Sequence, residues 1–347
     1  MNKIEFEEKL DFNNVLIRPK RSIISSRSEV ELNRKFKFKY SNKIWDNIPI
    51  IAANMDTTGT FEVYDCLKKN RIVTALHKFY KLHHFVEKQK EDLNYFDPDL
   101  FMVSTGISDN DLENLIEILS VVECNWICVD IANGYIDKLC EFCTKVRNIF
   151  PNKIIVAGNV VTREVVEDLI LNGKVDVVKV GIGPGSACTT RLKTGVGMPQ
   201  LSAILECADA AHGVGGHIVS DGGITCPGDM AKAFGAGADF VMVGGQFAGH
   251  DENPGEIIEE NDKKYKLFYG MSSDVAQNTH YGKMEKYRSS EGRVIKILYK
   301  GKLNDTVLDY LGGLRSTCTY INAYNIKNIP KCTTFVKVSQ QLNTVFV

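Results

Sequence analysis

The stretch KVGIGPGSACTTR, residues 179–191, decides how this chain is organised. An apolar run at residues 175–180 predicts a buried strand. The run breaks into a loop that contains three glycines and one proline. Glycine permits positive φ angles and lets a ligand approach the backbone closely. The stretch therefore predicts a strand that ends in a ligand-binding loop.

Cys188 lies at the end of this loop, with Ala187 before it and two threonines after it. A cysteine can be a nucleophile where backbone N–H groups or cations lower its pKa. A lone cysteine is more often a small, inert, buried side chain in a tight turn. Three glycines and the Ser-Ala-Cys-Thr-Thr-Arg run exceed what a turn needs, so the whole loop favours a functional interpretation.

Short apolar runs alternate with amphipathic stretches on both sides of this loop. We count eight such runs: 48–53, 71–76, 100–105, 126–132, 153–158, 175–181, 217–221 and 238–244. Helical patterns separate them, for example at 61–69, 109–119, 163–171, 200–213 and 227–235. Continuous β-branched runs between helices are typical of parallel strands covered on both faces. Eight in succession predict a closed (β/α)8 TIM barrel. A doubly wound open sheet would carry a phosphate fingerprint after its first strand, and none is there.

Polar or glycine-rich residues follow each apolar run. In a barrel these ends meet at the C-terminal rim, where active sites lie. Asp221-Gly222-Gly223 follows the seventh run and Gly244-Gly245 follows the eighth. Barrels commonly bind phosphate between these two loops. We therefore expect a phosphate site there, with Asp221 on a sugar hydroxyl rather than on the phosphate.

Charge and composition exclude several classes of function. The formal net charge of −1 provides no field for nucleic acid or for an anionic membrane. The ten cysteines form no regular disulfide framework, and the pair Cys140 and Cys143 falls in a helical pattern, so helix packing is favoured over zinc. The N-terminus has no signal-peptide pattern, and no apolar run reaches transmembrane length. We expect a cytoplasmic protein with reduced thiols.

The sequence predicts a single domain over residues 1–347. The barrel core is expected at about 48–250, a mobile flap at about 274–300 and a C-terminal segment at 301–347. A final helix is expected to start near Leu311, and the tail at 334–338 to pack against the body or a neighbouring subunit. A basic, serine-rich segment at 17–28 is either a surface loop or a phosphate-binding segment.

Several strings of residues resemble one family, the IMP dehydrogenase/GMP reductase barrels. They are 15–20, 51–56, 181–203, 220–223, 268–273, 287–292 and 312–320. Two details resemble the reductase branch: Gly270-Met271-Ser272-Ser273, and the flap string Tyr287-Arg288-Ser289-Ser290-Glu291-Gly292. The inserted regulatory domain that is usual in the dehydrogenases is not expected, because the interval between Leu76 and Leu100 predicts only a helix.

The resemblance implies that GMP and NADPH give IMP, ammonia and NADP⁺, as a step in purine salvage. Cys188 is implied as the nucleophile at purine C2, forming a covalent thioimidate. Thr190 and Glu291 are implied as the proton relay that lets ammonia leave. The resemblance also implies NADPH as cofactor, a potassium ion, and a homotetramer.

The resemblance assigns the binding residues by position. The implied GMP-binding residues are Ser186, Asp221, Gly222, Gly223, Gly244, Gly245, Gly270, Met271, Ser272, Arg288, Ser289, Ser290 and Gly292. The implied cofactor residues are Ser26, Arg27, Lys78, Asp130, Ile131, Ala132, Ile182, Gly183, Met271, Tyr287, Arg288, Ser316, Thr317, Cys318 and Thr319. Ser26 and Arg27 are implied to reach the adenosine end from a neighbouring subunit. The implied cation site uses the carbonyls of Gly183, Gly185 and Cys188 with a contribution from Arg191.

The sequence departs from the family pattern at two positions, and three other functions remain as alternatives. Met198 and Gln246 stand where the family often has an aromatic and an apolar residue. The first rival is an IMP dehydrogenase that lacks the regulatory domain. The second is a catalytically inactive nucleotide-binding or scaffold protein, against which Cys188, Thr190 and Glu291 argue. The third is a flavin-dependent, phosphate-binding barrel.

Overall fold

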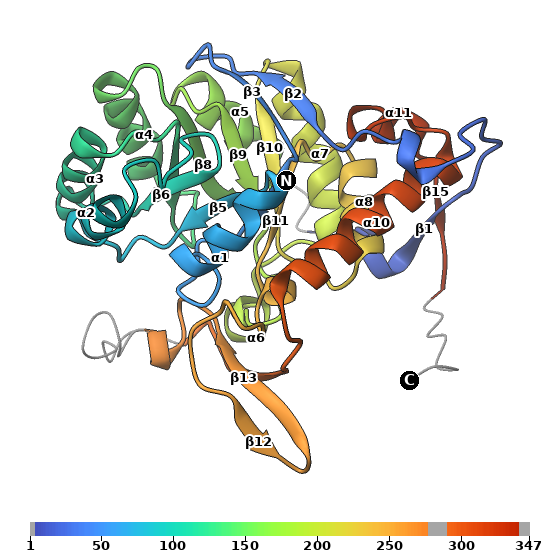
Figure 1. The fold of residues 1–347 in the computed structure, drawn as a ribbon. Coiled ribbons are helices and arrows are strands. Elements are labelled where there is room, and N and C mark those ends of the chain that lie inside the picture. Colours follow the sequence, from blue (N-terminus) through green and yellow to red (C-terminus); the bar gives the residue numbers. More distant parts are fainter. Residues whose placement is uncertain (1–3, 277–289, 340–347) are drawn as a thin grey trace.

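A computed structural model of the 347-residue chain describes residues 4–276 and 290–339. Eight parallel strands close into a barrel, and helices surround it (Figure 1). The barrel strands are β4 (Ile50–Ala52), β5 (Val73–Leu76), β6 (Phe101–Thr105), β7 (Trp126–Asp130), β8 (Ile154–Val160), β9 (Val177–Val180), β10 (His217–Asp221) and β11 (Phe240–Val243). The barrel closes where β11 pairs with β4. The predicted (β/α)8 fold is confirmed.

A helix follows each barrel strand on the outside. These helices are α1 (Phe61–Leu67), α2 (Leu82–Glu91), α3 (Asp109–Val121), α4 (Asp137–Ile149), α5 (Arg163–Leu171), α7 (Gln200–Gly213), α8 (Pro227–Gly235) and α10 (Leu303–Ile321). Between β9 and α7 lies the short helix α6 (Thr190–Thr194). No helix in the part of the chain that the structure describes is long and apolar enough to span a membrane.

Each of the eight predicted runs coincides with a barrel strand, because the strands are buried on both faces, although β8 continues two residues beyond the predicted run 153–158. The final helix, in contrast, was expected to start near Leu311 and begins at Leu303 instead. Gly312 and Gly313 are adjacent glycines, which are uncommon in helix interiors. In the structure they lie inside α10, and Gly313 lies against Pro227 at the start of α8. A short helix, α11 (Ile329–Cys332), follows.

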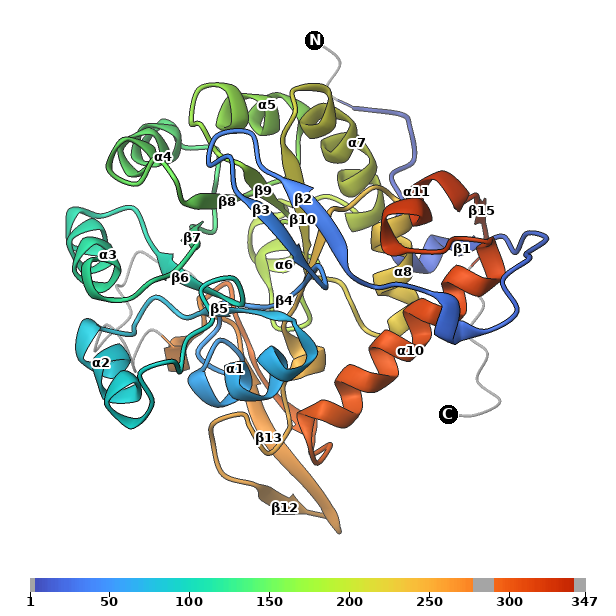
Figure 2. The same cartoon turned by 45° about the horizontal axis from the view of Figure 1, so that its top comes forward.

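An antiparallel hairpin closes the N-terminal end of the barrel. It consists of β2 (Arg34–Lys37) and β3 (Ile44–Asn47), and Figure 2 shows both strands lying across the barrel. Phe36 stacks on Phe240 with ring centroids 4.5 Å apart, and Trp45 meets Trp126 edge-on at 5.7 Å. Phe240 and Trp126 each begin a barrel strand. The aromatic side chains therefore fill this end, and the opposite end is left for a site.

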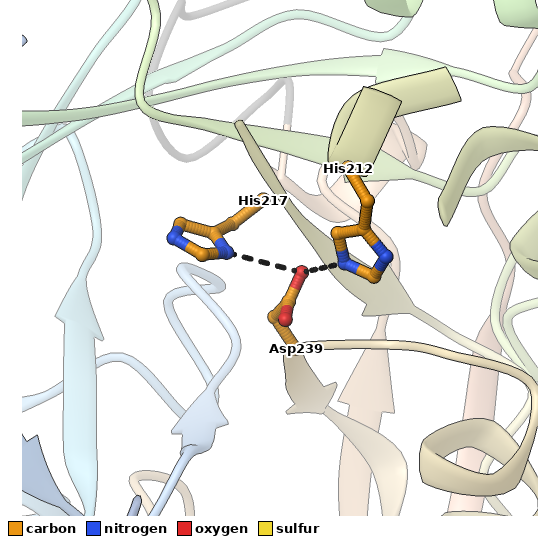
Figure 3. A group of neighbouring side chains, drawn as sticks. All are labelled: His212, His217 and Asp239. Carbon is orange, nitrogen blue, oxygen red and sulfur yellow. Dashed lines mark hydrogen bonds and ion pairs between the residues drawn. The ribbon is translucent and has the colours of Figure 1, made fainter. Parts of the chain in front are cut away.

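A buried carboxylate ties the hairpin to the barrel. Asp239, 1% exposed, accepts a hydrogen bond from Arg34 at 2.7 Å and one from His212 at 2.8 Å, and His217 lies 3.4 Å away (Figure 3). We call these four residues the Asp239 cluster. The ligand atoms of the two histidines and the aspartate lie within 4.8 Å of one another, as in some metal sites. Both carboxylate oxygens are already engaged, one of them by the Arg34 cation, so an ion-pair network explains the arrangement.

Two further sheets lie outside the barrel. β12 (Ile258–Glu260), β13 (Lys263–Tyr269) and β14 (Val294–Leu298) form an antiparallel sheet next to α6 (Figure 1). β14 lies within the region expected to be a flap, 274–300, so the end of that region is a regular strand. β1 (Val15–Ile17) pairs with β15 (Phe335–Lys337), which places the C-terminal tail against the body of this same chain.

Candidate active site

Three side chains form a chain of hydrogen bonds at the C-terminal end of β9. The Cys188 thiol donates to the Thr190 hydroxyl at 3.3 Å, and Thr190 donates to a carboxylate oxygen of Glu291 at 2.7 Å. We call this set the thiol relay. Cys188 comes from the loop after β9, Thr190 begins α6, and Glu291 immediately precedes β14. The structure thus brings together the three residues predicted to be catalytic.

Backbone contacts hold Glu291 in this position. Cys188 forms an antiparallel bridge with Gly292, and the Thr189 N–H donates to the carbonyl of Glu291 at 2.8 Å. Beside this bridge the Arg293 N–H donates to the carbonyl of Ala187 at 2.9 Å. The segment that carries Glu291 therefore adds a short strand-like pairing to the cysteine loop, and the relay is fixed by main-chain geometry.

The relay can move a proton between a thiol and a carboxylate. A hydroxyl both accepts and donates a hydrogen bond, so Thr190 can pass a proton from Cys188 to Glu291 and back. A thiolate is the nucleophilic form of cysteine. A group that takes the thiol proton and later protonates a leaving group is what covalent displacement requires.

The predicted phosphate residues lie beside this relay. A Cβ atom on Gly245 would lie 3.0 Å from Oγ of Ser186, so the Gly244-Gly245 turn and the cysteine loop face each other closely. Gly222 and Gly223 have φ angles of +91° and +80°, a conformation that favours glycine. Exposed backbone N–H groups in such turns and a serine hydroxyl are good phosphate donors.

The loop after β13 covers the same region. A Cβ atom on Gly270 would lie 3.0 Å from the Ala187 carbonyl, and Ser290 donates to the carbonyl of Gly292 at 2.9 Å. The predicted nucleotide residues Gly270, Ser272, Ser290 and Gly292 thus border the cysteine loop or the segment paired with it, whereas the sulfur of Met271 accepts from the Asp56 N–H at 3.4 Å, after β4. Arg288 and Ser289, predicted for the nucleotide, and Tyr287, predicted for the cofactor, lie outside the described residues.

The predicted cofactor residues fall into two groups. The first group lies at the rim: Asp130 ends β7, and β5, β7 and β9 are followed by Lys78, Ile131, Ala132, Ile182 and Gly183. Burial raises the pKa of Asp130, but the ammonium of Lys179 at 2.5 Å outweighs burial, and the pKa lies below its usual range. An ionised carboxylate can accept a hydrogen bond from a ribose hydroxyl or an amide, so this group fits the nicotinamide half of a dinucleotide.

The second group lies on the outer side of the barrel. Ser26 caps the short 3-10 helix Arg27–Glu29, which contacts α10, and α10 carries Ser316, Thr317, Cys318 and Thr319 near its C-terminal end. Figure 1 shows this end of α10 beside α11, away from α6 and β13. Within one chain the two groups therefore belong to different faces of the molecule.

The predicted cation residues form a tight loop around Arg191. A Cβ atom on Gly183 would lie 2.5 Å from Cγ of Arg191, whose guanidinium donates to the Met198 carbonyl at 2.6 Å. A potassium ion takes backbone carbonyl oxygens as ligands. The Gly185 carbonyl accepts from the Cys188 N–H at 3.0 Å, and the Arg191 carbonyl accepts from the Gly195 N–H at 3.1 Å, so both carbonyls belong to the turn that the predicted cation residues form.

The structure adds polar residues that sequence reasoning gave no role. Lys179 is 1% exposed and contacts both Asp130 and Asp221. Asn159 donates to Asp221 at 2.8 Å, and the buried Gln200 donates to the Val180 carbonyl at 2.8 Å. The available signal was a lysine inside an otherwise apolar barrel strand.

Comparison with known proteins agrees with the fold and the motifs. A family model described as "IMP dehydrogenase / GMP reductase domain" matches residues 9–343. The chain is 55% identical to "GMP reductase 1" of Rattus norvegicus over 350 aligned residues, covering 100% of both chains. It is equally 55% identical to "GMP reductase" of Salmonella paratyphi C, covering 99% of both chains.

Proposed function

Because this chain belongs to the IMP dehydrogenase / GMP reductase family, we propose that it is a GMP reductase. The proposed reaction is GMP + NADPH + H⁺ → IMP + NADP⁺ + NH₃. The observation that carries the proposal is the thiol relay, which gives a nucleophile and a proton carrier to one reacting carbon.

In the first half-reaction the sulfur of Cys188 bonds to purine C2 and the C2–NH₂ bond breaks. The thiol proton passes through Thr190 to Glu291 as the sulfur attacks. The same path returns the proton to the departing amine, so ammonia leaves as a neutral molecule and a covalent thioimidate remains. Atoms and charges balance without any other acid.

In the second half-reaction Cys188 is the leaving group. NADPH, when bound, supplies the hydride that replaces sulfur at C2. Glu291 has by then given the thiol proton to ammonia, so it takes up the H⁺ of the overall equation from solvent and passes it through Thr190 to the thiolate, which regenerates the resting thiol. Asp130 and Lys78 at the rim are proposed to hold the cofactor.

The nucleotide is proposed to bind with its phosphate between Ser186 and the Gly244-Gly245 turn. Asp221 would accept hydrogen bonds from the ribose hydroxyls. Gly222, Gly223, Gly270, Met271, Ser272, Arg288, Ser289, Ser290 and Gly292 complete the proposed nucleotide site. A potassium ion in the cysteine loop would hold the loop's carbonyls in place.

A homotetramer is proposed because the cofactor residues lie on two faces. The group of Ser26, Arg27 and residues 316–319 would complete the cofactor site of a neighbouring copy. Light scattering is expected to give four times the monomer mass, and a monomer that is fully active would contradict this arrangement. We treat the whole chain, 1–347, as one domain.

The direction of the nicotinamide absorbance change tests the reaction. The purified protein is expected to oxidise NADPH when GMP is present and to release ammonia in equal amount. Reduction of NAD⁺ with IMP would instead identify a dehydrogenase. GMP binding without turnover would indicate a binding protein, and a yellow protein a flavin enzyme.

A thiol variant tests the covalent step. Cys188→Ala is expected to lose at least about 1000-fold in turnover, the order of loss seen when a nucleophile is removed. Cys332→Ala on α11 is the matched control and is expected to keep full activity. Mass spectrometry of the acid-quenched wild-type enzyme with GMP should find an adduct on the Cys188 peptide.

A further inference from the structure

A lysine lies inside the barrel, where an apolar residue is normal. Lys179 is the third residue of β9 and is 1% exposed. Its neighbours in the strand are valines. An ammonium group out of water is costly unless it is paired and hydrogen-bonded. The partners of Lys179 therefore explain why this strand carries a charge.

The ammonium contacts the ends of three other strands. It lies 2.5 Å from the Asp130 carboxylate at the end of β7, 3.4 Å from the Asp221 carboxylate at the end of β10, and 3.3 Å from the Asn54 side-chain oxygen after β4. Both carboxylates therefore touch the same nitrogen.

These two carboxylates serve different halves of the proposed site. Asp221 belongs to the nucleotide and Asp130 to the cofactor. We propose that Lys179 is a positioning residue that joins these two halves: its single cation contacts both carboxylates and holds them in the orientation that each ligand needs. The inference rests on the proposed function and deepens it. Lys179 itself contacts neither reacting atom.

The surrounding charges support this role. Burial lowers the pKa of Lys179, but Asp130 and Asp221 outweigh burial and raise it above its usual value, so the group stays charged. Asp130 also faces Lys78 and the Cys128 thiol of its own strand. Without Lys179, the two partly exposed carboxylates would lose the cation that both contact, and neighbouring carboxylates without a cation between them disfavour each other's ionisation.

If Lys179 were purely structural, its removal should affect stability alone. A second buried ion pair next to β9 shows what that effect looks like. Asp176, which precedes β9, is fully buried and pairs with Arg147 at 2.6 Å, near the N-terminal end of the barrel. Arg147→Met removes a buried cation far from the rim. It is the matched control, expected to lower stability while leaving both Michaelis constants and the pH profile unchanged.

The test is Lys179→Met, which keeps the length of the side chain and removes its charge. The KM values for GMP and for NADPH are each expected to rise about tenfold or more, the usual cost of losing a group that orients a ligand-binding residue. The acidic limb of the kcat/KM profile is expected to move up by about one pH unit or more, because one carboxylate becomes protonated. Lys179→Gln is neutral but can still donate hydrogen bonds, and it should show the same changes. It replaces Lys179→Met as the test variant if Lys179→Met does not fold.

The outcomes separate this inference from the proposed function. If wild type turns over GMP and the folded variants keep both KM values within about twofold, Lys179 is structural and the inference is wrong. If wild type shows no turnover, the proposed function is wrong. The inference is then judged by calorimetry, which should show weaker binding of both nucleotides to Lys179→Met than to Arg147→Met. Loss of affinity for one nucleotide alone would also overturn the inference, because Lys179 would then act on only one half of the site.

Discussion

At the scale of single residues, the thiol relay joins positions that are distant in the sequence. Thr190 and Glu291 are 101 residues apart and meet at 2.7 Å. Spacing within the cysteine loop alone could not place Glu291, and its role came from resemblance to a family. Lys179 was missed because an isolated lysine in an apolar run carries no pattern, and its meaning appears only when Asp130 and Asp221 are beside it.

Replacing Glu291 by glutamine should stop the relay without removing its hydrogen bond. The amide oxygen of Gln can accept from Thr190, but it cannot take up the proton. We expect kcat for ammonia release to fall by about 100- to 10,000-fold, the range for losing a general acid–base group. Steady-state assays of NADPH oxidation with GMP measure the effect.

Glu260→Gln is the matched control for this prediction. Glu260 lies on β12, half-exposed, and pairs with Lys296 on the surface of the same antiparallel sheet. The same chemical change there is expected to leave kcat unchanged. Equal activity of the two variants would mean that the carboxylate of Glu291 carries no proton in the reaction.

Thr189 and Thr190 are adjacent, but only Thr190 belongs to the thiol relay. Thr190 contacts the thiol and the carboxylate, whereas the Thr189 hydroxyl donates to the Ser290 carbonyl at 3.3 Å. Valine has nearly the shape of threonine without the hydroxyl. We expect Thr190→Val to lower kcat by about 100-fold or more, and Thr189→Val to act mainly on KM through the loop. Steady-state measurement of kcat and KM for both variants tests this difference. Equal kcat values would mean that the Thr190 hydroxyl transfers no proton in the reaction.

At the scale of elements, burial on both faces explains what the sequence could predict. Strands such as β6 and β7 are continuous apolar runs, and their polar ends mark the rim. The β2–β3 hairpin was not predicted because its strands are short and mix charged residues with Phe36 and Trp45, so neither strand forms a continuous apolar run. β14 was missed because it pairs with β13 across the polar region expected to be a flap.

Gly313 is expected to be required by the packing of α10 on α8. A Cβ atom there would lie 2.4 Å from Cβ of Pro227, which real side chains do not tolerate without a shift. Gly313→Ala should lower the free energy of unfolding by about 1–3 kcal/mol, the usual cost of overpacking. Urea denaturation followed by circular dichroism measures the change.

The neighbouring residue gives the control for this packing argument. A Cβ atom on Gly312 would have no atom within 4 Å. Gly312→Ala should therefore raise stability by up to about 1 kcal/mol, since alanine restricts the unfolded chain and favours the helix. Two variants of equal stability would show that α10 can move away from α8 at no cost.

At the scale of the whole molecule, the two ends of the barrel differ in chemistry. Aromatic rings from the hairpin close the N-terminal end, and Asp239 anchors the hairpin through Arg34. The C-terminal end carries the thiol relay and the two carboxylates that contact Lys179. Stability and chemistry are thus placed at opposite ends, so changes in the Asp239 cluster should act on unfolding rather than on turnover.

The Asp239 cluster should make stability depend on pH in both directions. The hydrogen bond to Asp239 raises the pKa of His212 above its ordinary value. Protonated His212 therefore contributes stability that is fully present below the unfolded pKa and is lost as pH rises through the folded pKa. Burial raises the pKa of Asp239, but His212, His217 and Arg34 outweigh burial and lower it well below its usual range. That contribution is lost only in strong acid.

Urea denaturation of His212→Gln between about pH 6 and pH 9 tests the alkaline side of this argument. Wild type should be more stable than the variant at the acidic end of this window, and the difference should shrink as His212 in the native protein loses its proton. His83→Gln, on the exposed face of α2, is the control and should run parallel to wild type at every pH. A difference between wild type and His212→Gln that stays constant across the window would mean that His212 binds Asp239 as a neutral imidazole. The hairpin would then be held by Arg34 and aromatic packing without any contribution from a titrating histidine.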